Sequence, residues 1–261
     1  MLVKRQLGAV RRKFVSSLWK REALLETRGP IVSFTFDDFP RSALTTGGEI
    51  LCSHGVRGTY YAAAGMMGAS NQLGDQFRAA DLDKLLRDGH ELASHTFNHI
   101  SSRSVSVERF RSDVEKGRRA LEQITGQTDS GNFAFPFGQI TLNAKRVVGQ
   151  VVASSRGIMG GFNGPVVDLN MLRASSLYGG QSNRANIREL IVENNRRQGW
   201  LIFYTHDVRT TPSPYGCTPA LLEFAVSFAA QSCARVATVA EVLSEVTPRV
   251  VVQSYGVSAA L

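Results

Sequence analysis

Cysteine is scarce in this chain of 261 residues, and long apolar runs are absent. Cys52, Cys217 and Cys233 are an odd number without CxxC spacing, which argues against a disulfide framework and against a structural zinc site. No run is long enough to span a bilayer, and the N-terminal segment lacks the uninterrupted apolar stretch of a signal peptide. These absences predict a reduced, cytoplasmic protein.

Acidic residues are fewer than basic ones, but the excess of positive charge is local. The net charge is +8, and residues 1–30 contain eight lysines and arginines against only Glu22 and Glu26. Beyond residue 30 no basic stripe with interleaved aromatic residues appears, which argues against a nucleic-acid partner. The length and the 43% hydrophobic content fit one large α/β domain with a substantial core.

The N-terminal segment is basic and amphipathic. Apolar residues recur at steps of three or four among its arginines and lysines, which predicts a helix. The apolar stripe would pack on the catalytic domain or on a second subunit, or it would lie on an anionic membrane at the inner membrane surface. We therefore divide the chain into a basic helix (1–29), a catalytic domain (30–250) and a C-terminal tail (251–261). The stripe consists of Val3, Leu7, Val10, Phe14 and Leu18.

From residue 30 onward, short β-rich runs alternate with helical patterns. Seven or eight such β/α repeats in about 230 residues favour a parallel (β/α)7 or (β/α)8 barrel of the TIM-like type over an open sheet. The predicted helices are Thr46–His54, Leu82–Asp88, Val107–Thr125, Leu142–Gln150, Arg184–Gln198 and Pro219–Gln231. The predicted strands are Ile31–Phe36, Gly58–Ala64, Glu91–Thr96, Asn132–Phe137, Val151–Ser155, Leu172–Leu177, Leu201–Thr205 and Arg235–Thr238.

Polar residues gather at the carboxyl ends of four predicted strands. Asp37 and Asp38 follow the first strand, and His95 and His99 end the third. Pro136-Phe137-Gly138 ends the fourth strand, and His206-Asp207 follows Leu201–Thr205. A β/α barrel builds its active site on this face, so these residues are expected to meet there.

The side-by-side carboxylates and the histidine pair predict a metal-activated hydrolase. Successive strand side chains point to opposite faces, so one of the two aspartates must turn into a site. Two histidines four apart and one carboxylate make a facial set of three ligands that leaves positions open for water and substrate. A 2-His-1-carboxylate iron oxygenase has the same ligands, but it needs neither the second carboxylate nor His206.

Four ordered motifs over residues 30 to 245 resemble the polysaccharide deacetylases, also called the NodB-homology or carbohydrate esterase family 4 enzymes. They are Thr35-Phe-Asp-Asp38, His95-Thr-x-x-His99, Phe-Pro-Phe-Gly138 and Tyr204-Thr-His206. The resemblance implies a distorted barrel that removes an N-acetyl group from an amino sugar.

The resemblance also implies a role for each matching residue. Asp37 is the implied general base and His206 the implied general acid. Asp38, His95 and His99 are the implied metal ligands, and the backbone N–H of Phe137 is the implied oxyanion donor. An amide needs this set, because its carbonyl must be polarised and its amine must be protonated as it leaves. The side chains expected to contact the substrate are Pro136, Phe137, Tyr204 and Trp200.

The sequence departs from the family pattern at several positions. Ala134 stands where many members have an arginine that pairs with the catalytic aspartate, and Arg173 is our candidate for the missing partner. Phe39 replaces a common glycine, and Tyr204 replaces the usual leucine. Asp168 and Trp200 are candidates for the aspartate and tryptophan of the family's fourth motif.

Several questions stay open from sequence alone. Zn²⁺ is the default divalent metal, while Co²⁺, Ni²⁺ or Mn²⁺ also suit these ligands. The carbohydrate substrate is a soluble oligosaccharide, a nucleotide sugar or a lipid-linked intermediate rather than finished cell wall. A non-catalytic carbohydrate-binding barrel and a hydrolase of another linear or cyclic amide are alternatives. His54 and His90 are read as structural, the run Thr211–Gly216 is either structural or substrate-facing, and the oligomeric state is undetermined.

Overall fold

The computed structural model describes residues 15, 17–26 and 29–248. Its centre is a parallel sheet with the strand order β10-β11-β2-β3-β6-β7-β8, and β12 pairs with the first part of β2. The strands are β2 (Ile31–Asp38), β3 (Thr59–Ala62), β6 (Glu91–Ser94), β7 (Asn132–Ala134), β8 (Ser154–Arg156), β10 (Ser175–Ser176), β11 (Trp200–Thr205) and β12 (Arg235–Val236).

A short segment closes this sheet into a distorted barrel. Leu172 forms a parallel bridge with Arg156 of β8. Three residues further along the chain β10 begins, and it pairs with Phe203 and Tyr204 of β11. Residues 172–176 therefore contact both edges of the sheet, which gives a (β/α)7 architecture. The predicted single catalytic barrel is confirmed, and all eight predicted strands overlap a strand of the structure.

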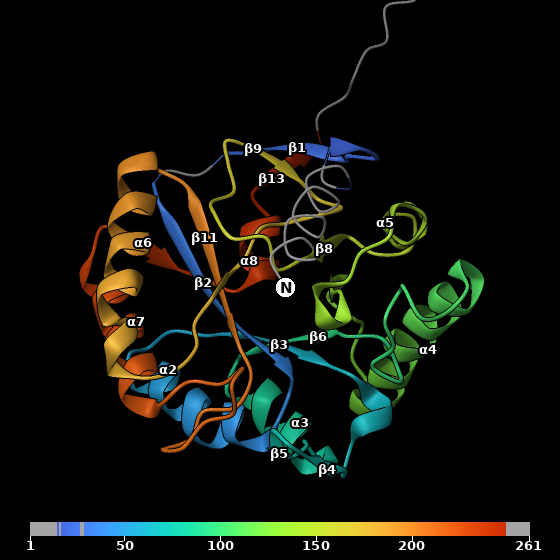
Figure 1. Cartoon of the computed structure of the whole chain (residues 1–261), viewed down its shortest axis with the longest axis horizontal. Helices are drawn as coiled ribbons and strands as arrows, with labels where there is room; N and C mark the ends of the chain where they lie inside the picture. The colour runs from blue at the N-terminus through green and yellow to red at the C-terminus, as the bar shows by residue number, and fades with distance from the viewer. Residues whose placement is uncertain (1–14, 16, 27–28, 249–261) are drawn as a thin grey trace, which may run out of the picture.

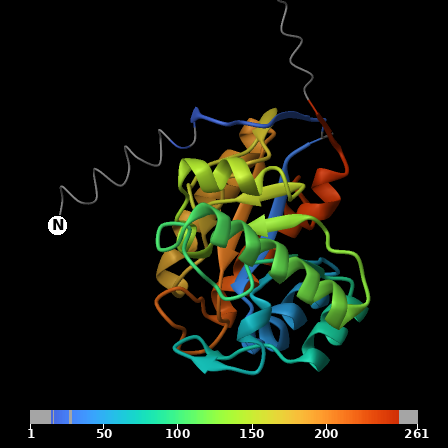
Figure 2. The same ribbon diagram turned by 90° about the vertical axis from the view of Figure 1, so that its right-hand side faces the viewer.

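Helices surround the barrel (Figure 1). Helices α6, α7 and α2 cover one side, and α4 and α5 lie together on the opposite flank, which Figure 2 shows face on. The helices are the π-helical turn η1 (Ala43–Gly48), α2 (Glu49–Ser53), α3 (Ala79–Arg87), α4 (Val107–Thr125), α5 (Leu142–Val148), α6 (Arg184–Arg197), α7 (Pro219–Gln231) and α8 (Val239–Leu243), with 3₁₀ turns η2 (Ala64–Met66), η3 (Pro136–Gly138) and η4 (Gln181–Asn183). None of the described helices is both long and apolar enough to cross a bilayer.

Strand β2 shows how the sequence builds this core. All eight of its residues are buried, as expected for a parallel strand covered on both faces. Phe34 and Phe36 face the helical layer, whereas Ser33 faces the barrel interior and accepts a hydrogen bond from the Trp200 indole at 2.9 Å. The same alternation points Asp37 into the barrel.

A second sheet lies across one edge of the barrel and was not predicted. It has the antiparallel order β13-β1-β9, formed by β1 (Glu22–Leu25), β9 (Val166–Asp168) and β13 (Val246–Pro248), and it is visible at the top of Figure 1. The predicted helix over residues 1–29 is therefore wrong for residues 22–25, which pair as a strand. Residues 1–14 lie outside the described part of the chain, as do 249–261, which include the predicted tail.

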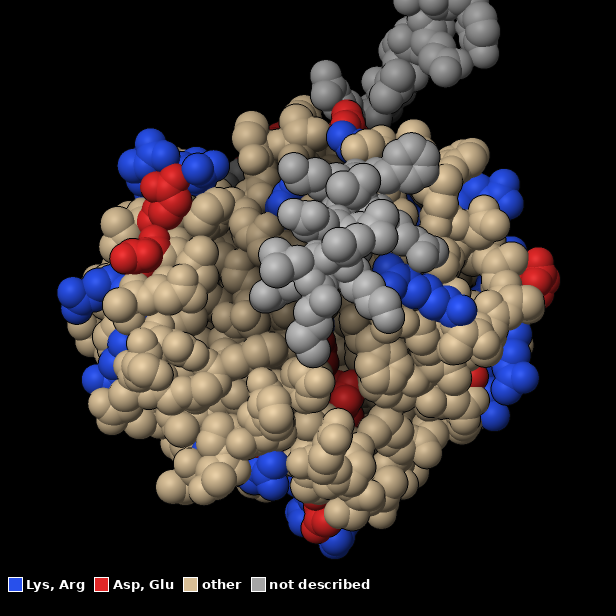
Figure 3. Space-filling model, viewed as in Figure 1, with Lys and Arg blue, Asp and Glu red and all other residues tan. Residues whose placement is uncertain are grey.

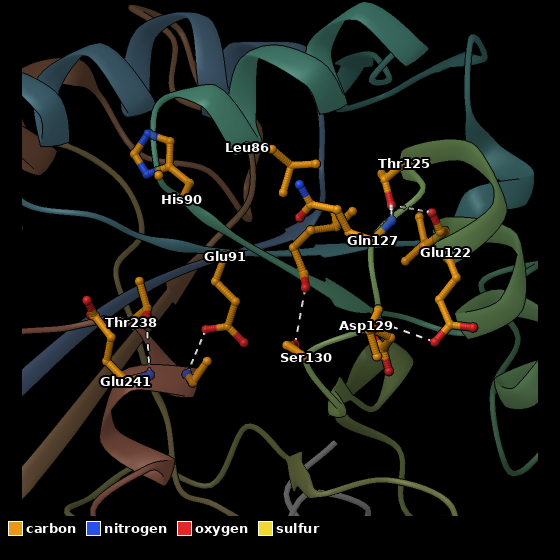
Figure 4. A pocket seen from close by; sticks show the side chains of 15 residues that line it. Leu86, His90, Glu91, Glu122, Thr125, Gln127, Asp129, Ser130, Thr238 and Glu241 are labelled. Carbon is orange, nitrogen blue, oxygen red and sulfur yellow. Dashed lines mark hydrogen bonds between the residues drawn. The ribbon is translucent and has the colours of Figure 1, made fainter.

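The amino end of the barrel is closed by polar contacts around Glu91. Its buried carboxylate accepts hydrogen bonds from Thr59 Oγ1, from Asn132 Nδ2 and from the Ala240 N–H at the start of α8. Figure 4 shows this carboxylate directed toward α8, in a pocket that also contains Asp129. Of the residues predicted for the site, Trp200 lies toward this end, at the start of β11.

Candidate active site

The predicted polar residues meet in one pocket at the carboxyl ends of the barrel strands. The pocket has a volume of about 420 Å³, and Asp37, Asp38, His95, His99 and His206 all line it. Figure 3 shows a hollow in the middle of this face with acidic side chains at its bottom. The remaining lining residues are Met66, Asn71, Gln72, Leu73, Phe137, Gly138, Gln139, Ile158, Tyr178, Tyr204 and Tyr215.

Asp38, His95 and His99 form a metal-ligand set. The Nε2 atoms of His95 and His99 lie 3.2 and 2.9 Å from Asp38 Oδ1. That oxygen is buried, yet it accepts no well-oriented hydrogen bond from the described residues. The three ligand atoms converge without hydrogen-bond geometry. This arrangement fits binding of a shared cation better than it fits hydrogen bonds between the three side chains.

The electrostatics of Asp38 agree with this interpretation. Burial raises the pKa of the Asp38 carboxyl, but the two imidazoles outweigh burial and hold this pKa below its ordinary value. The carboxylate is therefore ionised at neutral pH, as a metal ligand must be. His95 is oriented for the same role, since its Nδ1–H donates to the carbonyl of Ala134 at 2.8 Å and leaves Nε2 free to bind a metal.

Unusual backbone conformations turn these ligands into the pocket. Asp38, Phe39, Thr96, His99 and Phe137 all have φ between 52° and 64°, in the left-handed region. They are five of the seven non-glycine residues with positive φ in the described chain, so this strain is concentrated at the pocket. The turn at Asp38 resolves the problem of two adjacent strand carboxylates: Asp37 keeps the inward strand direction, and Asp38 leaves it.

Helix α4 supports the loop that carries the histidines. Asp113 accepts hydrogen bonds from the backbone N–H groups of Phe97 and Asn98, both at 2.9 Å. Gly117 packs directly on the loop, because a Cβ there would lie 2.6 Å from the carbonyl carbon of Thr96. A buried carboxylate and a missing side chain on one helix therefore set the position of His95 and His99.

Asp37 pairs with Arg156, not with Arg173. The Arg156 guanidinium donates to Asp37 Oδ1, and both side chains are buried. Burial lowers the pKa of Arg156, but the charge of Asp37, together with Tyr61 and Tyr204, raises it above its ordinary value. Arg173 instead donates to the carbonyl of Gly160 and lies outside the pocket, so our proposed Arg173–Asp37 pair is wrong.

The position of Arg156 explains the alanine at the expected arginine site. Ala134 of β7 and Arg156 of β8 are register partners in adjacent strands. The guanidinium thus enters the barrel from the neighbouring strand, over the ring of Tyr61 at 4.6 Å, through space that the small Ala134 leaves open. Arg156 directly follows the predicted strand Val151–Ser155, but strand register was needed to choose it over Arg173.

His206 and Phe137, the predicted acid and oxyanion donor, both line the pocket. His206 lines the pocket, and its Nδ1 lies 3.0 Å from the carbonyl oxygen of Tyr215. Phe137 is 58% exposed and packs against the ring of His99, with centroids 4.5 Å apart. Its backbone N–H has no acceptor among the described residues, so it is free to donate to a ligand.

Only some of the residues predicted to contact the substrate line the pocket. Phe137 and Tyr204 line the pocket, and Tyr178, which the sequence did not single out, packs edge-on against Tyr204 at 5.4 Å. Pro136 is buried and does not line the pocket. Trp200 is fully buried at the amino end of β11, so its assignment to the substrate is wrong. Asp168 is no pocket residue either, because it pairs with the buried Lys145.

A second group of possible ligands does not form a metal site. Cys52, Asp88 and His90 place ligand atoms close together. However, His90 Nδ1 accepts the Gly58 N–H at 3.1 Å, so the neutral ring carries its proton on Nε2, the nitrogen that faces Cys52 Sγ at 3.6 Å. The structural interpretation of His90 agrees with these contacts.

Comparison with known proteins identifies the family of this architecture. Residues 25–152 match the family model described as polysaccharide deacetylase. No curated protein matches the chain in sequence. Among solved structures, the chain is similar to a T48 deacetylase with substrate, with a TM-score of 0.56 and 14% identity over 84% of this chain and 94% of that one.

Two further structures share the fold. One is the Xyl-CE4 domain of a multidomain xylanase from the hindgut metagenome of Trinervitermes trinervoides, with a TM-score of 0.55 and 18% identity over 84% of this chain and 91% of that one. The other is a mutant of BA3943, a CE4 family pseudoenzyme, with a TM-score of 0.55 and 16% identity over 84% and 68%. At these identities the structural matches support the fold alone.

Proposed function

The chain belongs to the polysaccharide deacetylase family of hydrolases, and from this premise we propose that it is a metal-dependent enzyme that removes an N-acetyl group from an amino sugar. The observation that carries the proposal is the convergence of Asp37, the Asp38–His95–His99 set and His206 on one pocket. A non-catalytic carbohydrate-binding barrel would have no need for a paired base, a ligand set and an acid in one place.

The ligand set fits a divalent cation, and Zn²⁺ suits its mixed nitrogen and oxygen donors. When bound, such a cation supplies Lewis acidity that polarises the amide carbonyl and activates water near neutral pH. Among the three ligands, Asp38 provides the charge, and His95 provides an imidazole fixed by the Ala134 carbonyl. Co²⁺, Ni²⁺ and Mn²⁺ are the alternatives to be compared.

The other residues divide the proton transfers between them. Asp37 accepts the proton of the attacking water, and Arg156 holds its carboxylate in place and compensates its charge. The Phe137 N–H donates to the oxygen of the tetrahedral intermediate, where a fixed backbone donor stabilises developing charge. His206 Nε2 then gives a proton to the departing amine, which leaves as the C–N bond breaks.

We propose that the substrate is an oligosaccharide or a lipid-linked precursor at the cytoplasmic face of the membrane. The support is the basic, amphipathic sequence of the N-terminal segment, which matches the chemistry of an anionic lipid surface. Flotation of the full chain with anionic liposomes at low salt tests this location, with neutral liposomes as the control. Absence of flotation would exclude the membrane location and would leave a soluble oligosaccharide as the proposed substrate.

Acetate release from N-acetylated oligosaccharides, with and without added metal, tests the activity. Asp37→Asn should retain bound metal and lose turnover, whereas His95→Ala should lose both. Metal content measured by mass spectrometry separates the two variants independently of activity. Full activity of Asp37→Asn would refute the assignment of the base.

A further inference from the structure

Within the described part of the chain His206 has no carboxylate partner, although an imidazole that moves protons needs a fixed orientation. Its Nδ1 lies 3.0 Å from the carbonyl oxygen of Tyr215, which also receives a longer contact of 3.5 Å from Thr205 Oγ1. A carbonyl oxygen only accepts, so Nδ1 must carry the proton in this contact. The bond persists in both charge states of the ring, and Nε2 remains the nitrogen that gains and loses a proton.

The Tyr215 carbonyl is held in place by Asp207, the residue that follows His206. Asp207 is completely buried, and its two carboxylate oxygens accept from three groups of the following loop. Ser213 donates through its hydroxyl and through its backbone N–H, the latter at 2.8 Å, and Arg209 Nε donates at 2.8 Å. The side chain therefore binds both limbs of the loop that presents Tyr215.

The backbone of Asp207 fixes the end of the same loop. Its carbonyl accepts the Cys217 N–H at 2.9 Å, and the Arg209 N–H donates to the Cys217 carbonyl at 3.2 Å. Gly216 fits underneath without a side chain, because a Cβ there would lie 2.4 Å from both the carbonyl and Oδ1 of Asp207. The loop is thus closed around one carboxylate, with Tyr215 at the point nearest His206.

The charge state of Asp207 suits this function. Burial raises the pKa of Asp207, but the hydrogen bonds from Ser213 and the charge of Arg209 outweigh burial and hold this pKa below its ordinary value. An ionised carboxylate accepts all three hydrogen bonds, whereas with a protonated or amide group only the two N–H donors keep an acceptor and the Ser213 hydroxyl must turn from donor to acceptor.

We propose that Asp207 is the positioning residue of the general acid: through the loop that it anchors, it holds the Tyr215 carbonyl against His206 and so selects the ring tautomer and orientation that catalysis requires. The role assigned to His206 rests on the proposed function. The contact between ring and loop rests on geometry alone. Asp207 touches no reacting group, so its removal should alter the turnover step and leave substrate binding unchanged.

The test compares Asp207→Asn with the unaltered full chain loaded with Zn²⁺. Imidazole ¹⁵N shifts, assigned with His206→Gln, should place the His206 proton on Nδ1 in the unaltered enzyme and distribute it over both nitrogens in the variant. Acetate release should show kcat lower by about 10- to 100-fold at constant KM, as for a misplaced general acid. Ser213→Ala removes one donor to Asp207, and it should shift both readouts in the same direction by less.

Asp129→Asn is the matched control. Asp129 is a buried carboxylate that also binds one arginine, Arg118, and one backbone N–H, that of Gly131, but it lies at the amino end of the barrel (Figure 4). It should lose stability and leave the His206 tautomer and kcat unchanged. Unchanged tautomer and kcat in both Asp207→Asn and Ser213→Ala would overturn the proposal. If Asp207→Asn shifts the His206 tautomer but the unaltered chain releases no acetate, the result would support the positioning role of Asp207 and count against the proposed activity.

Discussion

Arg156→Met removes the positive charge of the Asp37–Arg156 pair while it keeps much of the volume of the side chain. Methionine fills much of the space of the arginine stem, so cavity effects are limited. The substitution leaves the Asp37 carboxylate, which is only 5% exposed, without its guanidinium partner. Breaking a buried pair in this way costs about 3–5 kcal/mol. Since a domain has about 5–15 kcal/mol of stability in total, the variant should fold but unfold at clearly lower urea concentration.

The rate should fall as well, because the carboxylate that accepts the proton of the attacking water loses the guanidinium that holds it in place. A general base is worth about 10²–10⁴-fold, which sets the upper limit of the loss in kcat. Adding Asp37→Asn to Arg156→Met removes the unpaired charge. We therefore expect the double variant to be more stable than Arg156→Met alone, and the double-mutant cycle measures the coupling.

A rescue experiment tests whether a guanidinium supplied from the neighbouring strand can replace that of Arg156. Ala134 and Arg156 are register partners, so Ala134→Arg in the Arg156→Met background returns a guanidinium from the neighbouring strand. It should recover part of the rate. Arg173→Met is the control, since Arg173 contacts the Gly160 carbonyl outside the pocket. Wild-type kcat in Arg156→Met would refute the assignment of Arg156 as the partner of the base.

Three further predictions follow from other contacts. Burial raises the pKa of Glu91 above 4.5, so stability falls as pH rises from 4.5 through this raised pKa, and Glu91→Gln should flatten the dependence of the urea midpoint on pH. Tyr204→Leu shortens a side chain of the pocket wall, so the rate ratio of N-propionyl to N-acetyl substrates should increase. Gly117→Ala forces the Thr96 backbone away from α4, so zinc affinity should fall about tenfold or more by competition with a chelator.

The sequence predicted the barrel and the ligand set because both depend on local patterns. Alternating apolar runs locate strands, and the polar residues after them must meet at one edge. The partner of Asp37 depends on register instead: Arg156 and Arg173 both lie in β-rich stretches, and only pairing with Ala134 places Arg156 in the barrel. Trp200, our candidate for the family's fourth motif, begins β11, whereas His206 follows the other end of that strand, so only His206 reaches the pocket.

The small sheet was missed for a related reason. β1, β9 and β13 are short segments from distant parts of the chain, and none has the length or alternation of an independent strand. The role of Asp207 in placing the Tyr215 carbonyl could not be predicted either. The sequence gives the composition of the Thr211–Gly216 loop but not the direction of the Tyr215 carbonyl.

The closure of the barrel also determines where it opens. Leu172 and Arg156 form a single bridge at the seam, with Leu172 N–H bound to the Ser155 carbonyl at 2.8 Å and Gly157 N–H bound to the Leu172 carbonyl at 3.1 Å. Local fluctuations start where few backbone bonds must break together, so these two amides should exchange with deuterium sooner than those of β2. Arg156 belongs to β8, the strand at this seam, whereas Asp37 belongs to β2 within the sheet. Transient opening of the seam would separate the two side chains. The lifetime of the Asp37–Arg156 pair therefore depends on how often the barrel opens.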